Sequence, residues 1–95
     1  MKTEFILDGA KIRTLKSFYK EVEREMLLDT NAIKRWSLDV FAEIFEGGYG
    51  VYDLNEDILV RWIHFRSSMD YLKPDDLQAI LDVFKMHSHV ELMVD

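Results

Sequence analysis

Apolar residues that alternate or run together predict three strands in this chain of 95 residues. Residues 3–7 form a short β-prone run that ends at a turn of sequence DGAK. Residues 58–65 carry β-branched and aromatic side chains at both alternating sets of positions, which predicts a strand covered on both faces. Residues 89–94 predict a third strand at the end of the sequence.

Helical spacing of apolar residues predicts three longer helices and one short helical turn. The first helix begins at Thr14, the second lies at residues 37–46, and the third begins at Pro74, which suits the first position of a helix. Residues 66–73 predict a single helical turn. The inner faces of the longer helices are apolar: Leu15, Phe18, Tyr19, Val22 and Met26 in the first, Leu38, Phe41, Ala42 and Phe45 in the second, and Leu77, Ile80, Leu81 and Phe84 in the third.

The predicted order of elements is β-α-α-β-(α)-α-β. Both connections between strands are long and helical, and such connections join parallel neighbours in a sheet. The sequence contains no linker, repeat or low-complexity segment, so residues 1–95 are expected to form a single domain. We therefore predict an α/β fold in which a three-stranded parallel sheet packs against three to four helices.

Composition narrows the class of protein. Hydrophobic residues make up 48% of the sequence and charged residues 32%, which is typical of a globular chain. The net charge of −6 argues against nucleic acid or an anionic membrane as a direct partner and is compatible with a basic protein. The absence of cysteine excludes disulfides and thiolate chemistry. No apolar run suits a signal peptide or reaches the roughly 18 residues of a membrane span, so we expect a soluble cytoplasmic protein.

The string SLDVFAEIFEGG combines a complete short helix with an acidic outer face. Ser37 can cap the first N–H groups, and Gly47 can close the helix in the left-handed conformation. Asp39, Glu43 and Glu46 recur at i, i+4 and i+7 without a lysine or arginine between them, so they repel one another by a few tenths of a kcal/mol per pair. Such a stripe is either ordinary solvated surface or a surface whose counter-charges belong to another molecule.

Aromatic residues flank this acidic helix. Trp36 directly precedes the capping serine, and Tyr49 and Tyr52 follow the helix. Aromatic residues beside a charged patch often serve as binding anchors, and we prefer Trp36 for that role. Packing of loops against the core is the commoner use of such residues.

No catalytic or metal site emerges from the sequence. His64, His87 and His89 fit no ligand pattern of zinc. The chain also lacks a phosphate-binding glycine loop with lysine and a serine in a nucleophile elbow. We therefore expect no enzyme activity, no cofactor and no metal.

The order of elements and four local strings together resemble the barstar family, small acidic inhibitors of a secreted ribonuclease: ILDGAKIRTLKSFYKEVEREM, SLDVFAEIFEGG, DILVRWIHF and LQAILDVFK. The resemblance covers nearly the whole chain and implies a barstar-like fold. It also implies that the acidic helix and the loop before it block a ribonuclease active site, with carboxylates in the place of substrate phosphates. Asp39 matches one acid of the family's inhibitory helix, and Glu43 stands where the family has its dominant aspartate. Gly47 matches the glycine after the helix.

The chain departs from the family at three places. Lys34 and Arg35 lie in the loop before the acidic helix, where the family is rich in tyrosine and glycine, and their charges would repel a basic active site. Met86 stands in the place of a further contact acid in the last helix. Gly48 replaces the aromatic residue that follows the helix-closing glycine, and Tyr49 comes one step later. These departures favour, as the partner, a nuclease or toxin other than barnase, the secreted ribonuclease that the family inhibits.

Two hypotheses about function follow. The first is an inhibitor, immunity protein or antitoxin that binds a basic ribonuclease or nuclease toxin and is a monomer when free. Its predicted partner-binding residues are Trp36, Asp39, Glu43, Glu46, Gly47 and Tyr49. The second is a non-inhibitory interaction module with the same fold and another partner, and the residues that favour it are Lys34, Arg35 and Met86.

Overall fold

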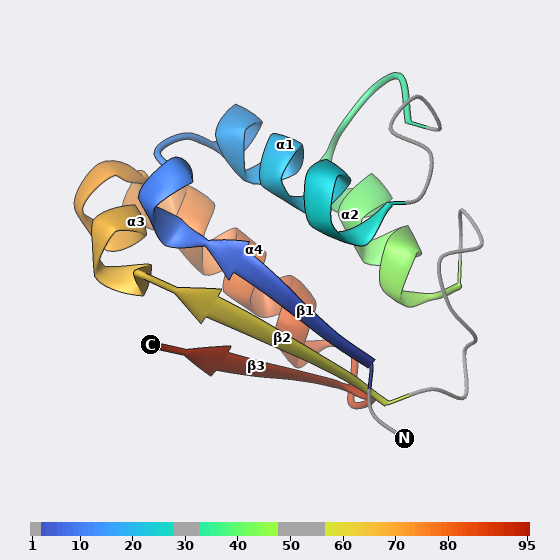
Figure 1. The fold of residues 1–95 in the computed structure, drawn as a ribbon. Helices are drawn as coiled ribbons and strands as arrows, with labels where there is room; N and C mark the ends of the chain where they lie inside the picture. The colour runs from blue at the N-terminus through green and yellow to red at the C-terminus, as the bar shows by residue number, and fades with distance from the viewer. Residues whose placement is uncertain (1–2, 28–32, 48–56) are drawn as a thin grey trace.

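The computed structural model describes residues 3–27, 33–47 and 57–95 (Figure 1). Its elements follow the predicted order, and the mixed α/β fold is confirmed. The bounds are β1 (Thr3–Asp8), the 3₁₀ helix η1 (Gly9–Lys11), α1 (Leu15–Met26), α2 (Leu38–Phe45), β2 (Ile58–Ile63), α3 (Phe65–Tyr71), α4 (Pro74–Lys85) and β3 (Val90–Val94).

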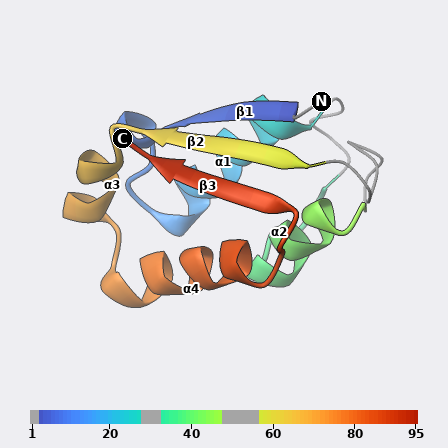
Figure 2. The ribbon, with the colours of Figure 1, turned by 90° about the horizontal axis from the view of Figure 1, so that it is seen from below.

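The three strands form one parallel sheet in the order β1-β2-β3. Thr3 of β1 is in register with Ile58 of β2, which is in register with Val90 of β3. Figures 1 and 2 show α1, α2 and α4 on one side of this sheet, and α3 beyond the C-terminal ends of the strands. The long helical connections therefore produce the parallel pairing that the sequence predicts.

Among the described elements, helices cover one face of the sheet and leave the other without helices (Figures 1 and 2). Every second residue of β2, from Ile58 to Trp62, is fully buried, whereas the residues that alternate with them are partly exposed. On the outer face, Arg61 lies 3.7 Å from Glu4 of the neighbouring strand. The prediction that residues 58–65 are covered on both faces is therefore wrong. Long charged side chains, rather than a second layer of helices, shield part of the outer apolar surface.

Aromatic side chains join the helices to the sheet. Trp62 of β2 stacks on Phe18 of α1 with 5.5 Å between ring centroids, and Phe18 meets Phe41 of α2 edge to face at 5.0 Å. Phe41 in turn contacts Phe84 of α4 at 5.6 Å. All four rings are buried, so this series of contacts fixes the inner side of α2 relative to the sheet.

The ends of the long helices follow local sequence signals. Thr14 caps α1 in a capping box with Ser17, and Pro74 is the first residue of α4. Within the described residues, no helix has both the length and the apolar character needed to cross a membrane.

Helix α3 has seven residues and exceeds the single turn that the sequence predicts. Ser68 of this helix is fully buried, and its Oγ accepts a hydrogen bond from Trp62 Nε1 at 3.0 Å. The same hydroxyl donates to the backbone oxygen of Gly9, also at 3.0 Å. These tertiary contacts extend the helix beyond what its own short sequence indicates.

Candidate functional site

Helix α2 carries the predicted acidic surface, and both of its ends have the predicted local signals. Ser37 Oγ accepts a hydrogen bond from the backbone N–H of Val40 at 3.2 Å. Gly47 adopts a φ of 86°, in the left-handed region that glycine enters without strain. The predicted bounds of 37–46 are confirmed to within one residue at each end.

Burial fixes the inner face of α2. Phe41, Ile44 and Phe45 are fully buried, and Phe45 meets Phe84 of α4 with 5.3 Å between ring centroids. Burying each such side chain stabilises the packed helix by about 1.5–3 kcal/mol. Rotation of α2 about its axis would expose all three of its buried side chains, so its outer face keeps one orientation.

Asp39 and Glu43 lie on the exposed face of α2, one helical turn apart. Asp39 is in the first turn, where the helix dipole stabilises a carboxylate by about 0.3–1 kcal/mol. No ion pair involves Asp39 within the described residues. Glu43 interacts with another group of the chain in addition to being exposed. The outward position of these two acids is as predicted, and their role in binding stays a prediction.

Glu46, the third acid of the stripe, is engaged by the protein itself. Its side chain is 57% exposed, and Oε1 lies 3.2 Å from Nε2 of His87, which is only 8% exposed. The other ring nitrogen of His87 lies 2.8 Å from the backbone oxygen of Val83. Both neighbours are acceptors when Glu46 is ionised, so a neutral imidazole, with one N–H, can satisfy only one of them. Glu46 therefore has a polar partner within the protein while its side chain stays exposed, and its role in binding stays a prediction.

His89 makes a second contact with the end of α2. Its Nε2 lies 2.7 Å from the backbone oxygen of Phe45, one of the carbonyl groups that a helix end leaves without an intrahelical partner. The rings of His87 and His89 meet edge to face at 6.0 Å. Two histidines therefore hold the last turn of α2 against the segment between α4 and β3. From the sequence, these histidines are considered only as possible metal ligands, and their contacts with α2 are not predicted. Among the described residues, no group of three His, Cys, Asp or Glu side chains could hold a metal ion.

Trp36, the preferred anchor, is partly buried by contacts within the chain. Its ring stacks on Tyr19 of α1 with 5.2 Å between centroids and 16° between planes. Its Nε1 donates a hydrogen bond to Glu23 Oε2 at 3.2 Å. These contacts give Trp36 a structural role, and an anchor role in addition stays a prediction. Tyr49 and Tyr52 lie outside the described residues.

The cations and the methionine that depart from the barstar pattern lie at the surface. Lys34 and Arg35 are exposed directly before α2, and Met86 is exposed at the C-terminal cap of α4. Gly48, the third departure, lies outside the described residues. The structure thus places two positive charges beside the acidic helix, where the sequence predicts them.

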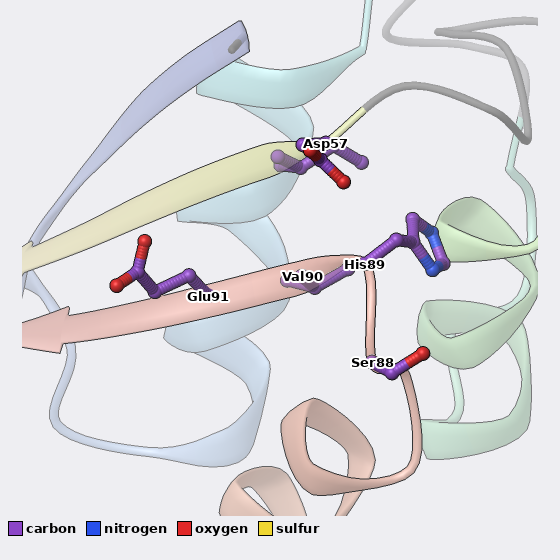
Figure 3. A pocket seen from close by; sticks show the side chains of 6 residues that line it. Asp57, Ser88, His89, Val90 and Glu91 are labelled. Carbon is purple, nitrogen blue, oxygen red and sulfur yellow. The ribbon is translucent and has the colours of Figure 1, made fainter.

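A polar pocket of about 390 Å³ lies where β2 and β3 begin (Figure 3), and it is lined by Asp57, Ile58, Ser88, His89, Val90 and Glu91. Nε2 of His89 is already bonded to the backbone of α2, which leaves Nδ1 for contacts within the pocket. Within the described residues, no hydrogen bond joins this ring to Ser88 or Asp57. The polar side chains of Ser88 and Asp57 are therefore not linked to each other through this ring.

Comparison with known proteins assigns no family to this chain. No protein-family model matches the sequence, and no curated protein matches it significantly. Inference about function therefore depends on the geometry of α2 and on the order of the elements.

Proposed function

We propose that the protein is a barstar-like inhibitor of a basic ribonuclease or nuclease toxin, and that α2 enters the active site of that enzyme. The observation that carries the proposal is the exposed pair of acids, Asp39 and Glu43, on a helix whose opposite face is fully buried. The two carboxylates take the place of substrate phosphates among cationic side chains. The protein performs no chemistry itself and acts, as a monomer in the cytoplasm, by occupying the site.

Preorganisation makes such a surface effective. Because aromatic packing and two terminal caps already order α2, binding does not have to order its backbone, and less of the interaction energy is lost to entropy. Opposite charges on the two proteins accelerate their encounter. The Debye length is about 8 Å at physiological ionic strength, so the association rate should fall as salt is added.

The proposal is tested by inhibition assays with a panel of purified basic ribonucleases that includes barnase. Asp39→Asn and Glu43→Gln should each weaken inhibition at least about tenfold, which corresponds to about 1.4 kcal/mol. Asp70→Asn removes an exposed acid from α3 and should leave inhibition unchanged, which makes it a matched control. Circular dichroism of each variant verifies the fold.

Three results would count against the inhibitor function. In the first, no enzyme of the panel is inhibited by the wild-type protein. In the second, the double variant Asp39→Asn/Glu43→Gln inhibits as strongly as the wild type. In the third, the association rate stays constant as ionic strength is raised, which would exclude electrostatic attraction by the acidic helix.

A second candidate is a non-inhibitory binding module with a different partner. The exposed cations Lys34 and Arg35 favour it, because they reduce the negative field around α2. The contact of Glu46 with His87 also favours it, because that acid already has a polar partner within the protein. Under this alternative, partner binding survives the double substitution of Asp39 and Glu43. The same set of variants therefore separates the two functions.

A further inference from the structure

A hollow of about 580 Å³ lies between α1 and the segment that precedes α2. We refer to it as the lysine groove, and it is lined by Leu15, Lys16, Tyr19, Lys20, Glu23, Ile33, Lys34 and Trp36. Its volume falls within the range of about 300–1,000 Å³ that is usual for ligand pockets. The exposed acids of α2 are not among its lining residues.

The apolar wall of the lysine groove is already formed. Tyr19 and Trp36 are stacked with 16° between their planes, and the hydrogen bond from Trp36 Nε1 to Glu23 fixes the indole in place. Ile33 is buried beneath the same surface. Burial and the charge of Asp76 raise the pKa of Tyr19, so its hydroxyl stays neutral. An apolar side chain could therefore be covered here without rearrangement of the protein.

The rim of the lysine groove is positive in a protein whose net charge is −6. Lys16 and Lys20 stand one turn apart on α1, Lys34 lies in the segment before α2, and all three are exposed. No ion pair of these three lysines occurs within residues 3–27, 33–47 and 57–95. The one carboxylate in the lining, that of Glu23, accepts the hydrogen bond from Trp36.

The position of Lys16 on α1 adds to this positive field. Lys16 is the second residue of the helix, and the first turn contains no acid. The N-terminus of a helix carries about half a positive charge, so a carboxylate is normally favourable there and a lysine is not. Lys16 therefore does little for the stability of the helix, and the positive end of the helix dipole adds to its attraction for an anion.

We propose that the lysine groove binds an acidic peptide segment of a protein partner. An apolar side chain of the segment packs on Tyr19 and Trp36, and its flanking carboxylates pair with Lys16, Lys20 and Lys34. A peptide suits the groove better than a nucleic acid does, because a peptide supplies an apolar side chain for this surface and the Tyr19–Trp36 stack leaves no gap for a base. The proposal is independent of the inhibitor function and accounts for cations beside α2 that a basic partner would not need.

The test uses a fluorescein-labelled peptide of sequence DEEFLEED and measures anisotropy at low salt. The wild-type protein should bind it, and affinity should fall at least tenfold for a peptide in which serines replace the two apolar residues. A peptide in which lysines replace the acids should not bind. A labelled twelve-nucleotide oligothymidylate should bind more weakly than DEEFLEED.

Variants of the protein locate the binding site. The triple variant Lys16→Gln/Lys20→Gln/Lys34→Gln should lose at least tenfold in affinity for the peptide. Lys85→Gln removes an exposed cation from the last turn of α4 and should bind as the wild type does. The double variant Asp39→Asn/Glu43→Gln should also retain peptide binding, so failure of this proposal is distinguishable from failure of the inhibitor proposal.

Any of four results would overturn the proposal. They are no binding of DEEFLEED up to millimolar concentration, equal binding of the serine peptide, tighter binding of the oligothymidylate, and unchanged affinity of the triple variant. Circular dichroism and a urea titration confirm that the triple variant is folded before its affinity is interpreted.

Discussion

Glu21 is a buried carboxylate that holds α1 to the end of β1, and Glu21→Gln should destabilise the protein. Its side chain is only 3% exposed. One oxygen accepts the backbone N–H of Asp8 at 2.7 Å, and the two oxygens accept Nη2 and Nε of Arg24 at 2.8 and 3.2 Å. A glutamine of the same shape has one oxygen, and its NH₂ group would face N–H donors.

The size of the effect follows from the exposure of each partner. A hydrogen bond to a charged group contributes about 1.5–3 kcal/mol, and this value applies to the bond that joins Glu21 to the Asp8 backbone. Arg24 is 51% exposed, so solvent screens its ion pair and reduces that contribution to about 0–1 kcal/mol. Together these give about 1.5–4 kcal/mol, a large share of the 5–15 kcal/mol typical of a folded domain.

Urea denaturation at pH 7, followed by circular dichroism, measures this loss as a change in the free energy of unfolding. Glu25→Gln is the matched control, because Glu25 pairs with the same arginine at 2.8 Å but its side chain is 30% exposed. The control should lose less than about 1 kcal/mol. A loss for Glu21→Gln no larger than that of the control would refute the reasoning, because the buried backbone contact would then contribute nothing.

Three further changes test contacts that join separate elements. Ser68→Ala should cost about 1–3 kcal/mol in urea denaturation, because Trp62 Nε1 and the oxygen of Gly9 lose their buried partner, whereas an effect below about 0.5 kcal/mol would contradict this. Gly9→Ala should cost at least about 1–3 kcal/mol, because its Cβ would lie 2.7 Å from the carbonyl carbon of His64, and a variant as stable as the wild type would exclude that clash. Hydrogen bonds with the His64 side chain and the backbone N–H of Ala10 lower the pKa of Asp8 below its ordinary value of 3.8. The Asp8 carboxylate therefore stabilises the fold fully above the pKa that it has in the unfolded chain, and this stabilisation is lost as pH falls through the lower pKa of the folded state. Unfolding free energies measured from pH 6 down to pH 2 should therefore decline less in Asp8→Asn than in the wild type. Equal declines in the two proteins would argue against a lowered pKa of Asp8 in the folded state.

Much of the fold could be predicted because its signals are local. Ser37, Gly47 and Pro74 each stand at a helix end with the residue type that such an end favours. The parallel arrangement follows from connections too long and too helical for hairpins. Signals of this kind are contained within a few residues or in the spacing of elements, and tertiary packing did not override them.

Other features depend on contacts between distant residues. Helical spacing places Glu21 away from the apolar face of α1. Its partner Asp8 lies thirteen positions earlier in the chain, and only the packed fold makes the burial of Glu21 favourable. The acidic site combines a local feature with a contact between distant residues. The exposure of Asp39 and Glu43 follows from helical spacing, whereas the contact of Glu46 with His87 spans 41 positions.

The two proposed surfaces have opposite charge and meet at Trp36. Its indole lines the lysine groove, and the next residue, Ser37, caps the helix that carries Asp39 and Glu43. Because the indole is stacked on Tyr19 of α1, the segment before α2 cannot move away from α1 without loss of that stack. A uniformly basic protein that covered both would be attracted by the acids and repelled by the lysines. If one partner contacts both surfaces, it must therefore present a cationic pocket with an acidic, apolar segment beside it, a requirement that the net charge alone would not impose.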